Sequence, residues 1–392
     1  MTENTFMIII AIIIGVMGGF GAVGIRTLIH EISNLSFAPV GKNLLENIIL
    51  APWYIKILIP VMGGIIVGPL IYYFAPEAKG HGVPEVMQAV ILKSGVIRPR
   101  VAVVKALASS ITIGTGGSVG REGPIIQIGA SLGSAVGQFF KVSGSRMKTL
   151  VGCGAAAGIA AAFNAPIAGA LFAVEIILMD FAVVQFSPIV ISSVVATVIS
   201  HHFEGNFAAF QVPSYELVNA LELVFYSLLG VLSGVASYLF IKVLYFFEDL
   251  FDHQFKVPQY VKPAFGGLII GGIALEFPQV MGVGYDSINN ALHGNTIWYI
   301  ALILIFVKIL STSITLGSGG SGGIFAPSLF IGAMLGAFFG YFVHQLFPSI
   351  TASPGAYALV AMGGLVAGTT RAPITAIIIV FELTNDYNII LP

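Results

Sequence analysis

Glycine-rich segments that run into a proline recur along this 392-residue chain. Three of them read GHGVP at 80–84, GREGP at 120–124 and GGIFAP at 322–327. Pro84, Pro124 and Pro327 suit the first position of a helix, because the N–H that proline lacks would have no partner there. The neighbouring N–H groups stay free at the positive end of the helix dipole. The segments therefore predict helix starts that bind a small anion.

One helix start could not hold a dehydrated anion by itself. Moving a bare ion into a medium of low dielectric costs on the order of tens of kcal/mol. The dipole of one helix contributes about 0.3–2 kcal/mol, and each charge-assisted hydrogen bond about 1.5–3 kcal/mol. We therefore expect several starts to converge on one ion, and weak binding at several points is also what conduction requires.

Ionisable side chains in these segments are functional candidates. The carboxylate of Glu122 lies inside a predicted anion site, where it could compete with the anion for the same N–H groups. Its protonation would remove the competitor, which makes it a proton-sensitive gate; a structural pair with Arg121 is the alternative. His81 is the histidine that falls inside a break. For Glu85, Glu175 and Glu382 we expect structural hydrogen bonding.

Other chemistry finds little support in the sequence. Cys153 is the single cysteine, which excludes an internal disulfide and a cysteine metal cluster. There is no HExxH motif, and the GxGxxG match at 317–322 lacks a preceding strand. The net charge of −1 comes without a basic tract, so nothing indicates nucleic acid. We predict no enzyme, cofactor or metal site; a membrane enzyme and a cation carrier are the rival classes.

The elements that position these segments must lie in a membrane. Hydrophobic residues make up 57% of the chain and charged residues 9%, against about 25% charged in soluble domains. Continuous apolar runs favour helices over the alternating strands of a β-barrel. Several runs are shorter than the roughly 20 residues of a full span, which predicts broken helices. The expected segments are 6–30, 53–75, 100–113, 124–140, 150–178, 184–202, 216–247, 261–276, 297–316, 323–346, 355–368 and 372–385.

The chain repeats itself. Residues 105–124 match residues 308–327, with Gly, Ser and Thr positions shared as well as apolar ones. This predicts a single transmembrane domain at 1–392, with a first repeat at about 1–205 and a second at about 206–392, and no cytoplasmic regulatory domain. The repeat mates Lys105 and Lys308 are expected to pair with buried acids or carbonyls. Glycines spaced by four, at 129–137 and 332–340, indicate helix packing.

These motifs resemble the CLC family of chloride channels and proton/chloride antiporters. The resemblance rests on GHGVPEV, GREGP, AAFNAPIAGALFAVE at 161–175, GGIFAP and the RAP…FELT pattern at 371–384, in the family's order. It implies an all-α membrane protein of two inverted-topology repeats of broken and tilted helices, which forms a homodimer with one anion path per subunit. It makes Glu122 the external gate and predicts a bound chloride. The predicted anion-binding residues are His81, Gly82, Arg121, Gly123, Ile324, Phe325 and Ala326.

The sequence departs from the family pattern at three places. His81 stands where the family has a chloride-binding serine. Ile176 stands where the antiporters have an internal glutamate that transfers protons. The family continues into a final helix with a tyrosine that contacts the central chloride, whereas this chain stops at Pro392 and Tyr387 does not match that tyrosine.

The predicted function is transmembrane transport of chloride, or of a similar small anion, gated by Glu122. Because Ile176 cannot carry a proton, we expect passive or loosely coupled conduction. The alternative is a proton/chloride antiporter with an unusual internal proton route. The expected partners are chloride, possible other small anions and protons, lipid and a second copy of the chain. The expected location is the cell membrane, as a multi-pass protein.

Overall fold

The computed structural model describes residues 3–384 except 39, 40, 42, 182, 206–209, 211, 214 and 216. Within these residues the regular structure is helical, and the only β pairing is two isolated backbone bridges. Six helices in the described part are long and apolar enough to cross a membrane. Shorter apolar helices lie among them, such as Val83–Leu92 and Pro373–Thr384. The prediction of an all-helical membrane protein with broken helices is confirmed.

The helices up to residue 204 carry the first glycine–proline breaks. They are α1 (Glu3–Ser36), α2 (Leu44–Leu50), α3 (Trp53–Phe74), α4 (Val83–Leu92), α5 (Arg100–Gly114), α6 (Glu122–Phe139), α7 (Gly144–Phe163), α8 (Pro166–Phe172) and α9 (Val183–Glu204). A 3-10 turn, η1 (Pro76–Ala78), precedes α4, and a π-helical turn, η2 (Ala173–Leu178), extends α8.

The helices from residue 222 onward follow a similar order. They are α10 (Glu222–Asp249), α11 (Lys262–Ile273), α12 (Tyr285–Leu292), α13 (Trp298–Gly317), α14 (Phe325–Leu346), α15 (Pro354–Thr370) and α16 (Pro373–Thr384). The π-helical turn η3 (Leu250–Gln254) extends α10, and the 3-10 turn η4 (Pro278–Val280) precedes α12.

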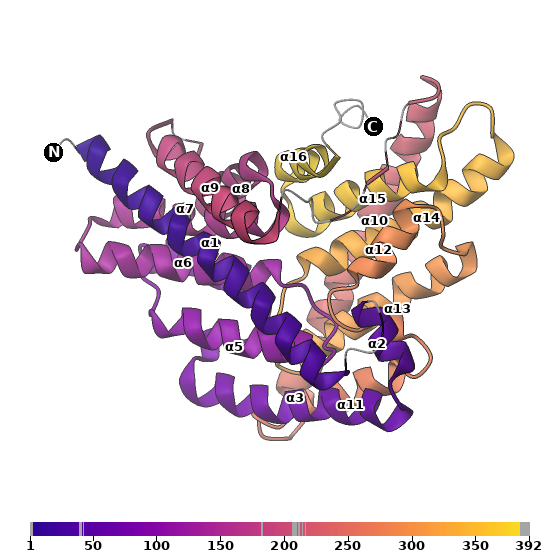
Figure 1. Ribbon diagram of the computed structural model, residues 1–392, viewed down its shortest axis with the longest axis horizontal. Coiled ribbons are helices and arrows are strands. Elements are labelled where there is room, and N and C mark those ends of the chain that lie inside the picture. The colour runs from indigo at the N-terminus through magenta and orange to yellow at the C-terminus, as the bar shows by residue number, and fades with distance from the viewer. Residues whose placement is uncertain are drawn as a thin grey trace.

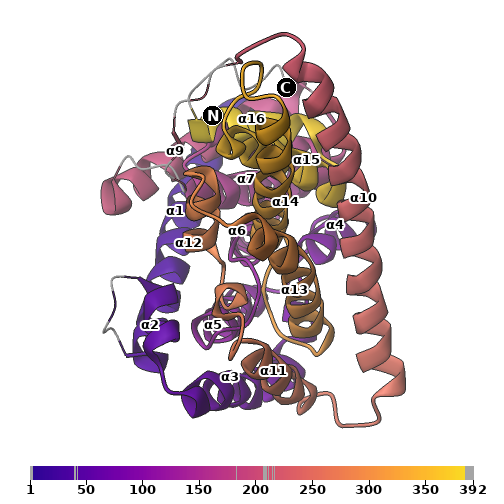
Figure 2. The same cartoon turned by 90° about the vertical axis from the view of Figure 1, so that its right-hand side faces the viewer.

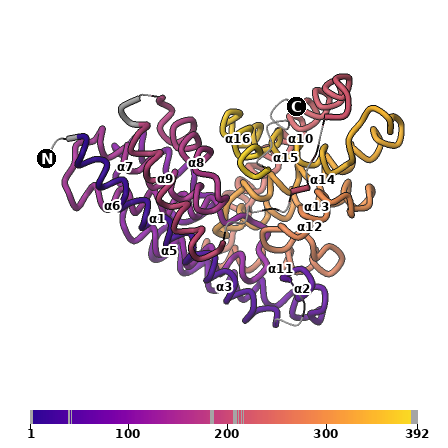
Figure 3. The backbone as a smooth tube through the Cα atoms, turned by 45° about the horizontal axis from the view of Figure 1, so that its top comes forward, coloured from indigo at the N-terminus to yellow at the C-terminus, as the bar shows by residue number. Residues whose placement is uncertain are grey.

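Most helices of the two sets occupy opposite sides of the molecule, whereas α2 lies beside the second set. Figure 1 shows α1 and α5–α9 on one side and α12–α16 on the other. Figure 3 shows the same division from a tilted direction. At one end, α3 and α11 pack side by side, whereas the long helix α10 runs along the edge of the second set (Figure 2).

Helices α3 and α11 contact each other through equivalent residues. A Cβ on Gly64 would lie 2.3 Å from the carbonyl oxygen of Pro263, and a Cβ on Gly267 would lie 2.2 Å from that of Pro60. Pro263 and Gly267 occupy in the second repeat the positions of Pro60 and Gly64 in the first. The contact is therefore reciprocal, as expected where two repeats meet about a pseudo-twofold axis.

The glycines spaced by four lie at helix–helix contacts, as predicted. In α6, a Cβ on Gly129 would lie 2.1 Å from the carbonyl oxygen of Gly154 in α7. In α14, a Cβ on Gly332 would lie 2.5 Å from the carbonyl oxygen of Ala361 in α15. Backbones approach this closely only where no side chain stands between them.

The expected segment at 150–178 is wrong as a continuous helix. Helix α7 ends at Phe163, Asn164 adopts a left-handed conformation with φ of 60°, and α8 begins at Pro166. Arg371 ends α15 in the same way, with φ of 58°. Asparagine tolerates this conformation better than most residues, and the following proline suits the start of the next helix. The short helices α4 and α12 lie outside the segments expected from apolar runs.

Candidate functional site

The three predicted breaks meet at the centre of the molecule through backbone hydrogen bonds. Gly120 and Gly323 exchange a pair of N–H to carbonyl bonds, with N to O distances of 2.8 and 2.7 Å. The N–H of Gly80 donates to Gly320, and the N–H of Gly322 donates back to Gly80, both at 3.3 Å. Segments some 200 residues apart are thus joined into one unit, with helix starts from both repeats around it.

The prolines do not occupy the first helical position, which corrects the prediction from the sequence. Pro84 is the second residue of α4, whereas Pro124 and Pro327 are each the third residue of α6 and α14. One or two N–H groups of each helix therefore precede the proline. Because helical bonds run from residue i to residue i−4, these N–H groups have no helical acceptor.

The free N–H groups belong to the predicted binding residues. The first helical bond of α6 runs from Ile125 to Arg121, and that of α14 runs from Ser328 to Ile324. In the part of the chain that the structure describes, the N–H groups of Gly123 and Ala326 have no backbone acceptor. The same holds for the N–H groups of Arg121, Glu122, Ile324 and Phe325.

The side chain of Glu122 is fully buried at this junction. Its Oε1 accepts a hydrogen bond from the hydroxyl of Tyr285 at 2.5 Å and lies 3.9 Å from Nε of Arg121. Its Oε2 has no hydrogen-bond partner among the described residues. Gly120 shows what lies around this oxygen. A Cβ built on Gly120 would lie 2.5 Å from Oε2 of Glu122 and 3.1 Å from the amide nitrogen of Ala326, so both atoms adjoin the same point. The carboxylate therefore lies beside the start of the helix from the other repeat.

Tyr285 is a site residue that the glycine–proline pattern did not identify. It is the first residue of α12, directly after the segment Gly282-Val283-Gly284. The guanidinium of Arg121 lies 5.0 Å from the centre of its ring, and the ring of Phe210 packs against it at 4.7 Å. One sequence pattern could have identified this position, because GVG at 282–284 repeats GHG at 80–82. The proline that marks the other breaks is missing there.

His81 and Gly82 lie next to α6. A Cβ on Gly123 would lie 2.4 Å from the carbonyl oxygen of His81, so the two backbones are in contact. The imidazole Nδ1 of His81 is buried and has no hydrogen-bond partner among the described residues. Gly82 caps α4 with φ of 87°, a conformation that favours glycine.

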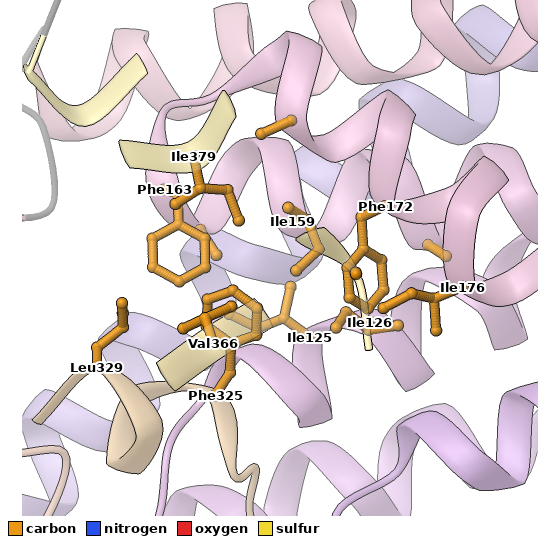
Figure 4. Close-up of a cluster of buried hydrophobic side chains, with 14 of the residues drawn as sticks. Ile125, Ile126, Ile159, Phe163, Phe172, Ile176, Phe325, Leu329, Val366 and Ile379 are labelled. Atoms are coloured by element: carbon orange, nitrogen blue, oxygen red, sulfur yellow. The ribbon is translucent and has the colours of Figure 1, made fainter. Parts of the chain in front are cut away.

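The start of α14 is lined by aromatic and aliphatic side chains. Phe325 is buried, and its ring lies 5.1 Å from that of Phe163 (Figure 4). Ile324 precedes it as the N-cap residue of the helix. Apolar walls of this kind lower the local dielectric, which strengthens the hydrogen bonds that an ion would receive.

Ile176 lies in the same apolar cluster, on η2. Figure 4 shows it beside Phe172 and Ile126, at the far side of the cluster from Phe325. Its side chain is buried, with 6% of its surface exposed. Because isoleucine has no titratable group, it cannot bind a proton. The structure thus places position 176 among buried apolar side chains.

The acids Glu175 and Glu382 form structural hydrogen bonds, as predicted. Glu175 accepts bonds from the N–H groups of Ile374 and Thr375, at the start of α16. Glu382, in α16, accepts bonds from Ile167 and Ala168, at the start of α8. Each carboxylate therefore caps the helix of the opposite repeat.

The buried lysines pair with carbonyls, one of the two partners expected for them. Nζ of Lys105 donates to the carbonyl oxygens of Ala78 and Gly80, at 3.1 and 2.8 Å. Nζ of Lys308 donates to those of Val280 and Gly282, at 3.0 and 3.1 Å. Each lysine holds the turn that leads into one of the GxG breaks.

Comparison with known proteins identifies the class. The family model described as voltage gated chloride channel matches residues 63–392. A ClcB-like protein of Ralstonia nicotianae is 34% identical over 390 residues, which cover 98% of this chain and 90% of that protein. An H(+)/Cl(-) exchange transporter, ClcA of Vibrio parahaemolyticus, is 34% identical over 399 residues, covering 98% and 84%.

Solved structures agree with this assignment. A slow cyanobacterial Cl-/H+ antiporter superposes with a TM-score of 0.89 at 29% identity, covering 100% of this chain and 92% of that one. A CLC-type fluoride/proton antiporter shares the fold, with a TM-score of 0.83 at 22% identity over 99% and 93%. The chain belongs to the CLC family. It is an integral multi-pass membrane protein of a family that transports anions.

Proposed function

We propose that this protein exchanges chloride for protons across a membrane, with Glu122 as the gate of the anion path. The observation that carries the proposal is the position of the Glu122 carboxylate, buried beside the amide of Ala326. A carboxylate there occupies the place of an anion at the helix start. When it takes up a proton it loses its charge, and the N–H groups become free for chloride. One group thus links protons to anions.

The anion path proposed here uses backbone donors from both repeats. Chloride is held by N–H groups at the starts of α6 and α14, with Pro124 and Pro327 keeping those helices in place. His81 and Gly82, ahead of Pro84 at the start of α4, contribute on the other side. Several weak donors without a fixed cation bind the ion yet let it leave. The donors are those of Gly82, Arg121, Gly123, Ile324, Phe325 and Ala326.

The names of the relatives support coupling of chloride transport to protons. They do not favour the passive conduction that we expected from the sequence. Relatives of 34% identity are named H(+)/Cl(-) exchange transporters, and a solved neighbour of 29% identity is a Cl-/H+ antiporter. The proposed proton route reaches Glu122 without using position 176. Passive or loosely coupled conduction is the second candidate, and the buried Ile176 is the observation in its favour.

Flux into liposomes with simultaneous recording of internal pH separates the two candidates. For an exchanger, an imposed chloride gradient drives protons uphill in a fixed ratio to chloride. A chloride flux without proton movement would overturn exchange and leave passive conduction. The matched variant is E122Q, in which proton movement should stop while chloride still passes.

We also propose the assembly and the setting. The protein acts in the cell membrane as a homodimer in lipid, with an anion path in each subunit and the repeats at 1–205 and 206–392 forming one transmembrane domain. The exposed apolar side chains of α8, α9 and α16, among them Ile167, Val198 and Ile377, support burial against lipid or a second copy. Cross-linking in native membranes followed by mass measurement tests the dimer, and a monomer would contradict it.

A further inference from the structure

Two cavities adjoin the gate, and they share two arginines. The first, of about 390 Å³, is lined by residues of α1, α2 and α12, including Tyr285. The second, of about 280 Å³, is lined by residues of α7 and α9, including Phe163, His201 and Glu204. The linings have only Arg26 and Arg121 in common. A single water needs roughly 10–15 Å³, so both cavities have room for a hydrated anion.

The shared arginines are only partly neutralised. Arg26 forms an ion pair with Glu204 and donates to the carbonyl oxygen of Ala162 at 3.4 Å. Arg121 lies 3.9 Å from Glu122, which is too far for a hydrogen bond, and that carboxylate already accepts from Tyr285. Nε of Arg121 is buried with no hydrogen-bond partner among the described residues. A guanidinium donor left in this condition favours an anion.

Each cavity is lined by a residue that contacts Glu122 or the start of α14. Tyr285, which lines the first, donates to the Glu122 carboxylate. Phe163, which lines the second, packs on Phe325 at the start of α14. His81 and Gly82 line neither cavity. The cavities that the two arginines share therefore do not reach the His81 break.

We propose that Arg26 and Arg121 form a second anion site outside the gate, which receives chloride before it reaches Glu122. Glu204 is the counter-ion of Arg26 that the arriving anion replaces. The inference rests on the proposed function, because it assumes that chloride passes Glu122. Fixed charge suits this position, since a basic cleft concentrates anions and raises their rate of arrival. The inner site differs, because it uses backbone N–H groups that release the ion easily.

The roles of Arg26 and Glu204 are tested by measuring how the flux depends on chloride concentration. R26Q should raise the chloride concentration for half-maximal flux by about tenfold at low ionic strength, with the maximal rate unchanged. R26K should have a half-saturating chloride concentration close to that of the wild type. E204Q should have a lower one, because it removes the counter-ion of Arg26. R98Q is the matched control, because Arg98 pairs with Glu77 away from both cavities. A half-saturating concentration that R26Q leaves unchanged would overturn the proposal.

Crystals of the full chain in bromide give an independent readout. We expect one anomalous peak at the shared arginines and another at the helix starts beside Glu122, and R26Q should remove only the first. A peak at the helix starts alone, or an outer peak that persists in R26Q, overturns the outer site and leaves the proposed function intact. Absence of both peaks in crystals of the wild type overturns both.

Discussion

The GxG break at 80–82 and its counterpart at 282–284 have the same backbone and different chemistry. Each holds two glycines at positive φ, 73° and 87° in the first and 63° and 88° in the second. Each follows a 3-10 turn whose carbonyls accept from a buried lysine, Lys105 or Lys308. The side chains within and after the two breaks differ. The first break carries His81, whereas the second leads into Tyr285, which contacts the proposed gate, Glu122.

The difference shows what duplication preserves. Positions that hold the backbone keep the same residue types, because a Cβ at positive φ is strained and a turn carbonyl needs a donor. Positions that face the path are free to change. The two breaks therefore bring different groups to the region of Glu122. The first brings an imidazole nitrogen with no partner among the described residues, and the second a phenol bonded to Glu122.

The largest effect is expected where the second break meets the gate. In E122Q the competing charge is gone, so chloride flux at neutral pH should rise roughly ten- to a hundredfold, because one charge-assisted hydrogen bond is worth about 1.5–3 kcal/mol. Flux through the wild type should increase as pH falls, because protonation neutralises the carboxylate. Chloride efflux from liposomes that contain E122Q should not change with pH. A pH profile that E122Q leaves unchanged would remove Glu122 as the gate.

The shared lysines should matter equally to both breaks. K105M and K308M each leave two turn carbonyls without their donor, at a cost of about 1–3 kcal/mol for each buried acceptor. We expect similar decreases in Tm for the two variants, followed by tryptophan fluorescence in detergent. K56M is the control, since Lys56 donates to a carbonyl at an exposed position. Unequal shifts would show that the two turns are not equivalent.

Tyr285 should set the pH at which the gate opens. Its hydroxyl stabilises the charged form of Glu122, so Y285F should open the path at higher pH. The measurement is the pH of half-maximal chloride flux in liposomes, which should lie higher in Y285F than in the wild type. The matched control is Y226F, which removes a similar tyrosine–glutamate bond, to Glu222, far from the gate. Equal behaviour of the two variants would contradict a gating role.

The smallest effect is expected at the first break. H81S and H81V should change the relative permeability of chloride, bromide and nitrate, about twofold, since one hydrogen bond of about 0.5–1.5 kcal/mol is altered. The H81V variant gives the first break the residue of its counterpart, Val283. Permeability ratios from reversal potentials in planar bilayers provide the measurement. If both variants keep the wild-type ratios, the imidazole does not face the ion.

Much of the fold was predictable because lipid imposes a simple rule on sequence. Long apolar runs became helices close to the expected bounds, as for α3 at Trp53–Phe74 against 53–75. The rule fails for short helices that end inside the protein. Helix α12 carries Asp286, Asn289 and Asn290 within eight residues, so no apolar pattern reveals it.

The first helical residues were also beyond local prediction. Proline fixes its own dihedral angle but does not prevent the preceding residues from entering the helix, so α6 begins at Glu122 and α14 at Phe325. Gly120 and Gly323 hold these starts by bonds between repeats. Such bonds depend on how the two repeats pack, which local propensity does not describe.

By itself the sequence determined the solvent, the duplication and the identity of the gate candidate, because composition, repetition and an acid inside a helix start are properties of neighbouring residues. Only the tertiary structure decided which groups Glu122 contacts. Its hydrogen-bond partner Tyr285 lies 163 residues further along the chain. Contacts at such separations follow from packing of whole helices, so the partners of the gate became visible only in three dimensions.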